Sequence, residues 1–220
     1  MSRWPTRVVP LSTMDLECNR SDVVFDLRHD IFAIRESFDS PMMDIGELAY
    51  ASAALVASDP RDGDVIVEIG TFEGLTACFL AKVLDALGVR ACVLSIDPFE
   101  RFEGGDNNPP GSYAGYIANL QTHGAERCFP LVAFSHECVD AVAGNVPFLL
   151  IDGDHSYEAC LGDLELYCPK VRSGGYVLID DYSHKHYPGV AQAVDEYFGA
   201  ATDFELLHLA WFAIARRRVG

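Results

Sequence analysis

The sequence lacks three features that would each point to a particular class of protein. Its apolar runs stop well short of the ~20 residues that a helix needs to cross a bilayer, and Arg3 and Arg7 are not followed by the apolar stretch of a secretory signal. The seven cysteines form no CxxC pair, and several stand inside apolar runs such as 77–79 and 91–93. This pattern favours reduced, buried thiols over a disulfide framework or a zinc site. We therefore expect a cytoplasmic protein that does not enter a membrane.

Basic residues are also scarce, since 16 lysines and arginines stand against 33 acidic residues and give a net charge of −17. Nucleic acids and anionic membranes bind cationic surfaces, so neither is an expected partner. Most of the acidic residues are expected to be solvated at the surface. The 220 residues suffice for one domain with a sizeable core. We predict a single domain over 1–220, with a helical segment over 1–60 and the functional core over 61–220.

What the sequence does contain is a repeated alternation of strand and helix patterns. Strands are predicted at 65–69, 91–96, 129–133, 148–151 and 174–179. Helices are predicted at 23–38, 42–57, 74–87, 113–123, 136–143, 156–168 and 188–199. Two final apolar runs, 204–207 and 211–215, are close enough to form a hairpin. The pattern predicts an α/β protein with a doubly wound, mostly parallel seven-stranded sheet and an antiparallel C-terminal hairpin.

Acidic residues follow two of these predicted strands. Asp152, Asp154 and His155 come directly after 148–151, and Asp180 and Asp181 come directly after 174–179. Because parallel strands end at the same edge of a sheet, these carboxylates are expected in one crevice. Such a concentration of negative charge is costly unless a cation neutralises it. Oxygen ligands without clustered cysteine or histidine suit Mg²⁺ or Mn²⁺, so the sequence predicts a divalent metal site.

The stretch 67–74 passes from a strand through a tight turn into a helix. Gly70 permits close backbone approach, and Gly74 permits close packing at the helix start. Phe72 stands where a dinucleotide fingerprint has its second glycine, which disfavours a nicotinamide dehydrogenase. Glu68 suits a ligand carrying an ammonium group, and Asp97, after the next strand, is placed to accept hydrogen bonds from ribose hydroxyls. Together, Glu68, Gly70, Gly74 and Asp97 predict a nucleoside-binding site without a phosphate cradle, which favours S-adenosylmethionine over NAD.

Several of these motifs resemble a known family. The stretches 67–74 (ValGluIleGlyThr…Gly) and 95–97 (SerIleAsp) resemble the cofactor motif of class I methyltransferases. The stretches 152–158, 174–182 and 187–190 resemble metal-dependent small-molecule O-methyltransferases, in particular the macrocin O-methyltransferase-like branch that modifies sugars of natural products. The resemblance covers roughly 42–215. It implies the Rossmann-like methyltransferase fold, S-adenosylmethionine as methyl donor, and Mg²⁺ held by Asp152, Asp180 and Asp181.

The resemblance also suggests roles for the remaining site residues. The second Asp of the AspGlyAsp motif, Asp154, is implied as the base that deprotonates a hydroxyl acceptor. Catechol O-methyltransferase, a more distant relative, has a lysine where His155 stands, so His155 is a second candidate. Asp154 as a helix cap, and His155 as a residue that orients a carboxylate, remain open alternatives. The other residues that the resemblance places at the cofactor are Phe72, Thr76, Ser135, His136 and Asp152.

The expected substrate is a small molecule with a hydroxyl group beside a second oxygen, in a sugar or another natural-product intermediate. His184, His186 and Tyr187 are candidates for the acceptor pocket, with exposed loop positions as the alternative, and 98–112 is a candidate lid or else a disordered loop. Two other functions remain open: a catechol- or phenol-directed methyltransferase, and a non-catalytic small-molecule-binding module with the same fold. The amino-terminal segment is a candidate for supporting a homodimer.

Overall fold

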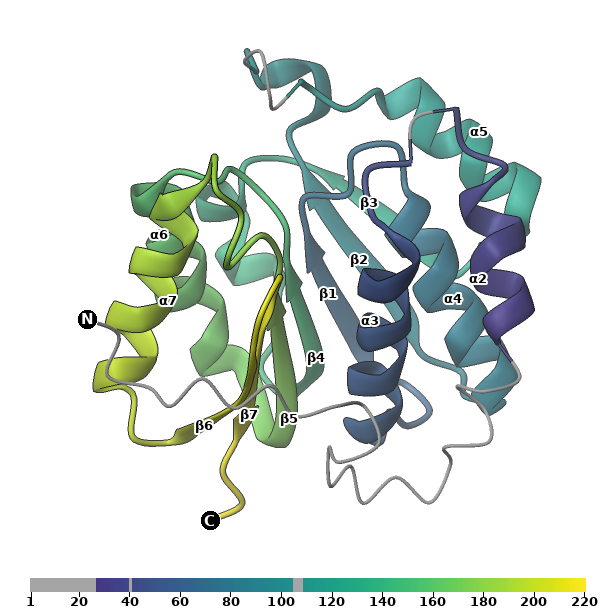
Figure 1. Ribbon diagram of the computed structural model, residues 1–220. Helices are drawn as coiled ribbons and strands as arrows, with labels where there is room; N and C mark the ends of the chain where they lie inside the picture. The colour runs from purple at the N-terminus through teal and green to yellow at the C-terminus, as the bar shows by residue number, and fades with distance from the viewer. Residues whose placement is uncertain (1–26, 40, 105–108) are drawn as a thin grey trace.

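A seven-stranded sheet forms the centre of the molecule (Figure 1). The computed structural model describes residues 27–39, 41–104 and 109–220. The strands follow the order β3-β2-β1-β4-β5-β7-β6. Their bounds are β1 (Val65–Ile69), β2 (Cys92–Asp97), β3 (Cys128–Val132), β4 (Val146–Ile151), β5 (Val171–Ile179), β6 (Phe204–Leu209) and β7 (Ala213–Arg217). The first five strands run parallel, and β7 pairs antiparallel with β5 and β6, so the predicted fold class is confirmed.

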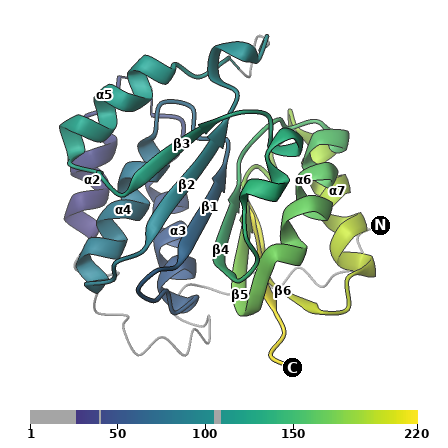
Figure 2. The same cartoon turned by 180° about the vertical axis from the view of Figure 1, so that it is seen from behind.

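Helices cover both faces of this sheet, as Figures 1 and 2 show from opposite sides. Their bounds are α2 (Arg28–Arg35), α3 (Ile45–Ala57), α4 (Leu75–Leu87), α5 (Tyr113–His123), α6 (Tyr157–Tyr167) and α7 (Pro188–Ala200). Alternate residues of a strand point to opposite faces. In β4, Phe148 and Leu150 therefore join the core beneath α2 to α5, whereas Leu149 and Ile151 join the core beneath α6 and α7. Every residue of β4 is buried, which explains its uninterrupted apolar sequence.

Local signals set most of the helix ends. Helix α3 begins at Ile45 rather than at the predicted residue 42, because Asp44 forms a capping box with Glu47. Helix α4 ends at Gly88, which has the left-handed conformation expected of a C-cap glycine. The predicted helix over 23–38 is observed as α2, and its first residues, 23–26, lie outside the described residues together with the rest of 1–26.

The predicted helix over 136–143 is wrong. That segment forms two short 3₁₀ turns, η3 (Ser135–Glu137) and η4 (Val139–Ala141). The carbonyl of Ser135 accepts from the N–H of Cys138 at 3.3 Å, three residues later, whereas a continuous α-helix would have it accept from residue 139; it also accepts from the hydroxyl of Tyr167 at 2.7 Å. The backbone instead closes i→i+3 bonds, such as Ala141 N to Cys138 O at 2.9 Å.

Helices α3, α4 and α6 contact the strands directly, whereas α2 and α5 pack on other helices. The division into a helical segment over 1–60 and a core over 61–220 stays a prediction, although α2 and α3 contribute to the same apolar cluster as α4. Within the described part of the chain, no helix combines the length and the apolar character needed to cross a bilayer.

Candidate active site

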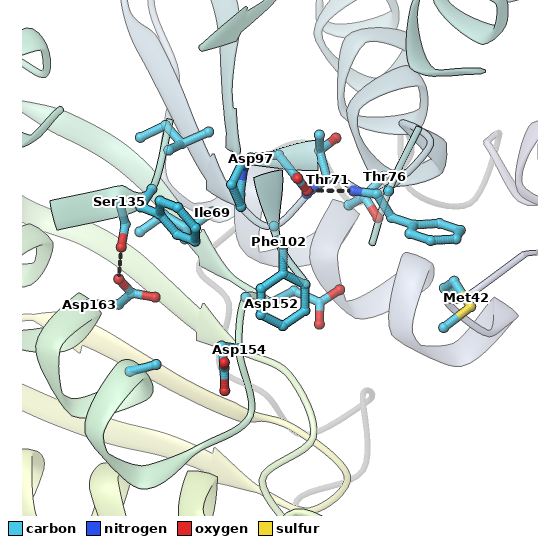
Figure 3. Close-up of a pocket in the computed structure, with 18 of the residues that line it drawn as sticks. Met42, Ile69, Thr71, Thr76, Asp97, Phe102, Ser135, Asp152, Asp154 and Asp163 are labelled. Atoms are coloured by element: carbon cyan, nitrogen blue, oxygen red, sulfur yellow. Dashed lines mark hydrogen bonds between the residues drawn. The ribbon is translucent and has the colours of Figure 1, made fainter. Parts of the chain in front are cut away.

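A cavity of about 400 Å³ opens at the carboxyl ends of β1, β2 and β4 (Figure 3). Eight of the residues predicted at the site line it: Gly70, Phe72, Thr76, Asp97, Ser135, His136, Asp152 and Asp154. Phe38 and Met43, from the chain around α2 and α3, line it as well, and so do Phe102, Pro109 and Gly111 of the predicted lid over 98–112. Positions 105–108 of that predicted lid lie outside the described residues.

The glycine turn forms the floor of the cavity. Gly70 has φ +79°, and a Cβ atom there would lie 1.9 Å from the carbonyl oxygen of Asp152. Only glycine therefore allows the end of β1 to meet the end of β4 this closely. Gly74 does not line the cavity, but it begins α4 at φ +85° and packs against the ring of Tyr116. This position agrees with its predicted role in helix packing, but the structure does not bring Gly74 to the cavity, contrary to its predicted place at the cofactor.

Asp97 holds the turn in place from the end of β2. One carboxylate oxygen accepts hydrogen bonds from the backbone N–H groups of Thr71 and Phe72, each at 2.9 Å. The other oxygen accepts from the N–H of Phe99 at 2.6 Å. These bonds also stabilise Phe72, whose φ of 51° is unfavourable for a residue with a side chain. Asp97 therefore stabilises the glycine turn. It also lines the cavity, and its contact with a ribose stays a prediction.

The structure does not bring Glu68 to the cavity, contrary to its predicted contact with the cofactor. Its side chain is fully buried on the α4 and α5 face, and its Oε2 accepts a hydrogen bond from Ser95 Oγ at 2.6 Å. Burial raises the pKa of Glu68 to about 7. The prediction failed because it used the position of Glu68 near the strand end but not the face of the sheet.

Two of the three predicted metal ligands meet beside the cavity, together with His155. Asp152, His155 and Asp181 each offer one ligand atom, and these atoms all lie within 4.8 Å of one another. His155 Nε2 lies 3.1 Å from Asp181 Oδ2 and 3.7 Å from Asp152 Oδ1. Asp180, the third predicted ligand, is buried next to this group, and its Oδ1 accepts from the N–H of Asp181. The sequence predicted His155 as a candidate base or as a residue that orients a carboxylate, but not as a metal ligand.

The carboxylates at this end repel one another. Burial, and then the charge of Asp181, raise the pKa of Asp152 well above its ordinary value. Burial and the charge of Asp152 do the same to the pKa of Asp180. A divalent cation would relieve this repulsion, and carboxylate oxygens are the ligands that Mg²⁺ prefers, so the donor set fits such an ion.

Sequence reasoning missed a further carboxylate, that of Glu47 in α3. Burial raises its pKa to about 7, and the charges of Asp44 and Asp181 add to the effect. The available signal was the capping box, in which Asp44 N donates to Glu47 Oε2 at 2.5 Å. That pattern alone indicates a helix cap and not a site residue. The packing of α3 against β4 and β5 brings Glu47 near the acidic cluster.

The two candidate bases occupy different positions. Asp154 lines the cavity, and its Oδ1 accepts from the N–H of Ser156 at 2.7 Å. Ser156, rather than Asp154, is the N-cap of α6. His155 does not line the cavity, and its ring stacks on Tyr187 with a centroid distance of 4.1 Å. Tyr187 in turn stacks on His184, so two of the predicted acceptor-pocket residues lie close to the acidic cluster.

The side of the cavity away from Met42 and Thr76 lies between β3 and α6 (Figure 3). Ser135 Oγ donates a hydrogen bond to Asp163 Oδ1 at 2.5 Å, and both residues line the cavity. Asp163 was not singled out in the sequence, where it stands inside a helical pattern without a motif. His136 stacks on Phe134 beside this pair.

Comparison with known proteins identifies the family. A family profile described as "Methyltransferase domain" matches residues 67–182, which is more than half of the chain. The chain belongs to this methyltransferase family.

Solved structures share the fold of this methyltransferase. The O-methyltransferase NovP superposes with a TM-score of 0.68 and 22% identity, covering 94% of this chain and all of that one. An O-methyltransferase from Bacillus cereus, in complex with SAH, superposes with a TM-score of 0.60 and 12% identity, covering 88% of this chain and 91% of that one. These similarities confirm the predicted methyltransferase fold.

A relative of this methyltransferase occurs in a virus. Uncharacterized protein R132 of Acanthamoeba polyphaga mimivirus is 29% identical over 141 residues. The match covers 62% of this chain and about 60% of the length of that curated relative.

Proposed function

We propose that this methyltransferase transfers the methyl group of S-adenosylmethionine to a hydroxyl group of a small molecule, with Mg²⁺ bound at the acidic cluster. The observation that carries the proposal is the position of Asp152. Its carboxylate belongs to the candidate metal cluster and also lines the cavity. A metal-bound acceptor would therefore lie next to a methyl donor held in the cavity.

The lining of the cavity supports a cationic methyl donor. It includes six acidic residues, which are Glu73, Asp97, Asp152, Asp154, Glu158 and Asp163, and none of the described lining residues is lysine or arginine. The sulfonium and ammonium groups of S-adenosylmethionine are both positive, so this field favours them. The related fold from Bacillus cereus binds SAH, the demethylated product of the same donor. Thr76 and Phe72 would contact the methionine part from the first turn of α4 and the glycine turn.

Mg²⁺ would be held by Asp152 and Asp181, with Asp180 or His155 as a further ligand. When bound, the cation lowers the pKa of an acceptor hydroxyl and fixes its oxygen near the methyl group. Asp154, whose carboxylate faces the cavity and makes one hydrogen bond in the described structure, would accept the proton. His155 is the second candidate for this base, because its ring nitrogen lies 3.7 Å from Asp152 Oδ1, at the cluster that would hold the acceptor.

The proposed acceptor is a sugar or another natural-product intermediate with two adjacent oxygens, as in the macrocin O-methyltransferase-like branch. The motifs at 152–158 and 174–182 support this choice. A catechol or another phenol is the second candidate, since the stacked rings of Tyr187 and His184 near the acidic cluster would also accommodate an aromatic ring. A cytoplasmic location, one domain over 1–220 and a homodimer belong to the same proposal.

The experiment combines calorimetry with a transfer assay. S-adenosylmethionine is titrated into the protein with and without Mg²⁺, and methyl transfer to glycosides and to aromatic diols is followed in Mg²⁺ and in EDTA. We expect donor binding in both conditions and transfer only with Mg²⁺. Transfer that persists in EDTA would refute the metal role, and the absence of donor binding in both conditions would favour a non-catalytic binding module.

A further inference from the structure

The side of the cavity between β3 and α6 contains a further carboxylate, that of Asp163, which faces Gly153. Asp163 is only 5% exposed, and it lines the cavity from the middle of α6. Figure 3 shows it facing Ser135, on the opposite side of the cavity from Met42 and Thr76. A carboxylate at such a position costs free energy unless its oxygens have partners.

The two oxygens of Asp163 have different surroundings. Oδ1 accepts the hydrogen bond from Ser135 Oγ. No described residue donates a hydrogen bond to Oδ2, which faces Gly153, where an added Cβ atom would lie 3.4 Å away. Oδ2 is therefore an acceptor, fixed in direction by Ser135, that still has capacity for a ligand.

Ser135 is itself firmly held. The hydroxyl of Tyr167 donates to its carbonyl oxygen at 2.7 Å, and Tyr167 is buried. The pair Ser135–Asp163 is thus preorganised by two elements, the turn after β3 and helix α6. Preorganisation of this kind favours recognition, because binding does not have to pay for ordering the acceptor.

Small residues and aromatic rings line this side of the cavity. Ala159 and Gly162 of α6 line the cavity there, and an added Cβ atom at Gly162 would meet nothing within 4 Å. The stacked rings of Phe134 and His136 line the same side. Asp97 and Asp163 line the same cavity, so a nucleoside whose ribose contacts Asp97 can extend its base toward Asp163.

We propose that Asp163 recognises the adenine base of the methyl donor, with Oδ2 accepting a hydrogen bond from the exocyclic amino group and Ser135 holding Oδ1. This inference rests on the proposed function. A carboxylate accepts hydrogen bonds and repels another acceptor, so it distinguishes adenine from hypoxanthine, in which an oxygen replaces the amino group. Leaving such buried polar groups unpaired costs about 10- to 100-fold in affinity.

The test measures a ratio of affinities by calorimetry. S-adenosylhomocysteine and S-inosylhomocysteine are titrated into the wild-type protein, Asp163→Asn, Asp163→Ala and the control Glu165→Gln, which changes an exposed carboxylate of the same helix. We expect the wild type and the control to prefer the adenosyl ligand by at least about 10-fold. In Asp163→Ala the preference falls toward one, and in Asp163→Asn it falls or reverses, since an amide also donates.

Each outcome decides a separate question. A structural role for Asp163, as a brace for Ser135, would weaken both ligands equally and leave the ratio unchanged, which would overturn the inference. Circular dichroism shows whether each variant is folded, and the two substitutions provide independent ratios. If the wild-type protein binds neither ligand, the proposed function fails. If it binds both with equal affinity, only the recognition of adenine by Asp163 fails.

Discussion

Two groups of carboxylates lie at the same edge of the sheet and differ in what surrounds them. On the β1 and β2 side, Asp97 accepts three backbone hydrogen bonds, and Glu68 accepts one from Ser95 and is buried away from the cavity. On the β4 and β5 side, Asp152 and Asp181 have His155 as their close neighbour and otherwise face other carboxylates. Asp97 therefore serves the structure, whereas Asp152 and Asp181 remain available for a ligand.

This difference separates structural from functional acidic residues without reference to any motif. A carboxylate whose oxygens are saturated by backbone N–H groups stabilises the fold on its own. A group of carboxylates in which burial and neighbouring negative charge raise the pKa of two members, Asp152 and Asp180, destabilises the fold until a cation binds. Such a group is costly to maintain, which makes it a candidate for function.

The largest expected effect is that of Asp152→Asn on turnover. Removing a ligand of the proposed Mg²⁺ should lower kcat on the order of 10³-fold, which corresponds to a rise of about 4 kcal/mol in the activation free energy. Metal affinity is measured in parallel by electron paramagnetic resonance with Mn²⁺, for Asp152→Asn, Asp180→Asn and His155→Gln. Whichever of the last two loses metal affinity is the further ligand. Full activity in Asp152→Asn would contradict the proposal that Asp152 holds the metal while Asp97 only stabilises the fold.

A smaller effect is expected for Glu68→Gln, on stability. The folded state raises the pKa of Glu68 from 4.5 to about 7, so the stabilising contribution of the protonated carboxyl is complete below pH 4.5 and is lost as the pH rises through about 7. A glutamine side chain does not titrate, so the Glu68→Gln variant does not lose this contribution. The free energy of unfolding of the variant should exceed that of the wild type by up to about 3 kcal/mol at pH 8, and the two values should converge near pH 4.5.

Urea unfolding at several pH values checks this prediction, with Glu126→Gln, an exposed position, as the control. Parallel pH curves for the wild type and Glu68→Gln would show that the buried carboxyl does not titrate differently in the folded state.

The smallest expected effect is on the free energy of unfolding, which should change in opposite directions, or not at all, for Asp97→Asn and Asp152→Asn. In metal-free protein, Asp97→Asn should lower the free energy of unfolding by about 2 kcal/mol, because charged hydrogen bonds to the glycine turn are lost. Asp152→Asn should leave it unchanged or raise it, because a repulsive charge is removed. Thermal unfolding in EDTA measures both variants. A loss of stability in both would mean that Asp152 is as structural as Asp97.

Much of the fold was predictable from local patterns. The bounds of β1 and α5 agree with the sequence, because their period and their caps are local signals. The turns over 135–141 were predicted wrongly as a helix, because one of their contacts is with Tyr167, about thirty residues later, which no local pattern shows. The acidic cluster was predictable in outline, because consecutive carboxylates after apolar strands are visible in the sequence.

The sequence by itself determined the alternation of strands and helices, the glycine turn and the gathering of Asp152, Asp180 and Asp181 at one edge. Only the tertiary structure decided that Glu68 faces away from the cavity, that Glu47 and His155 join the acidic cluster, and that Asp163 meets Ser135. The physical reason is that periodicity and caps act over a few residues. Packing brings distant segments together, and these segments decide which face of a strand lines the cavity and which residue becomes the partner of a buried carboxylate.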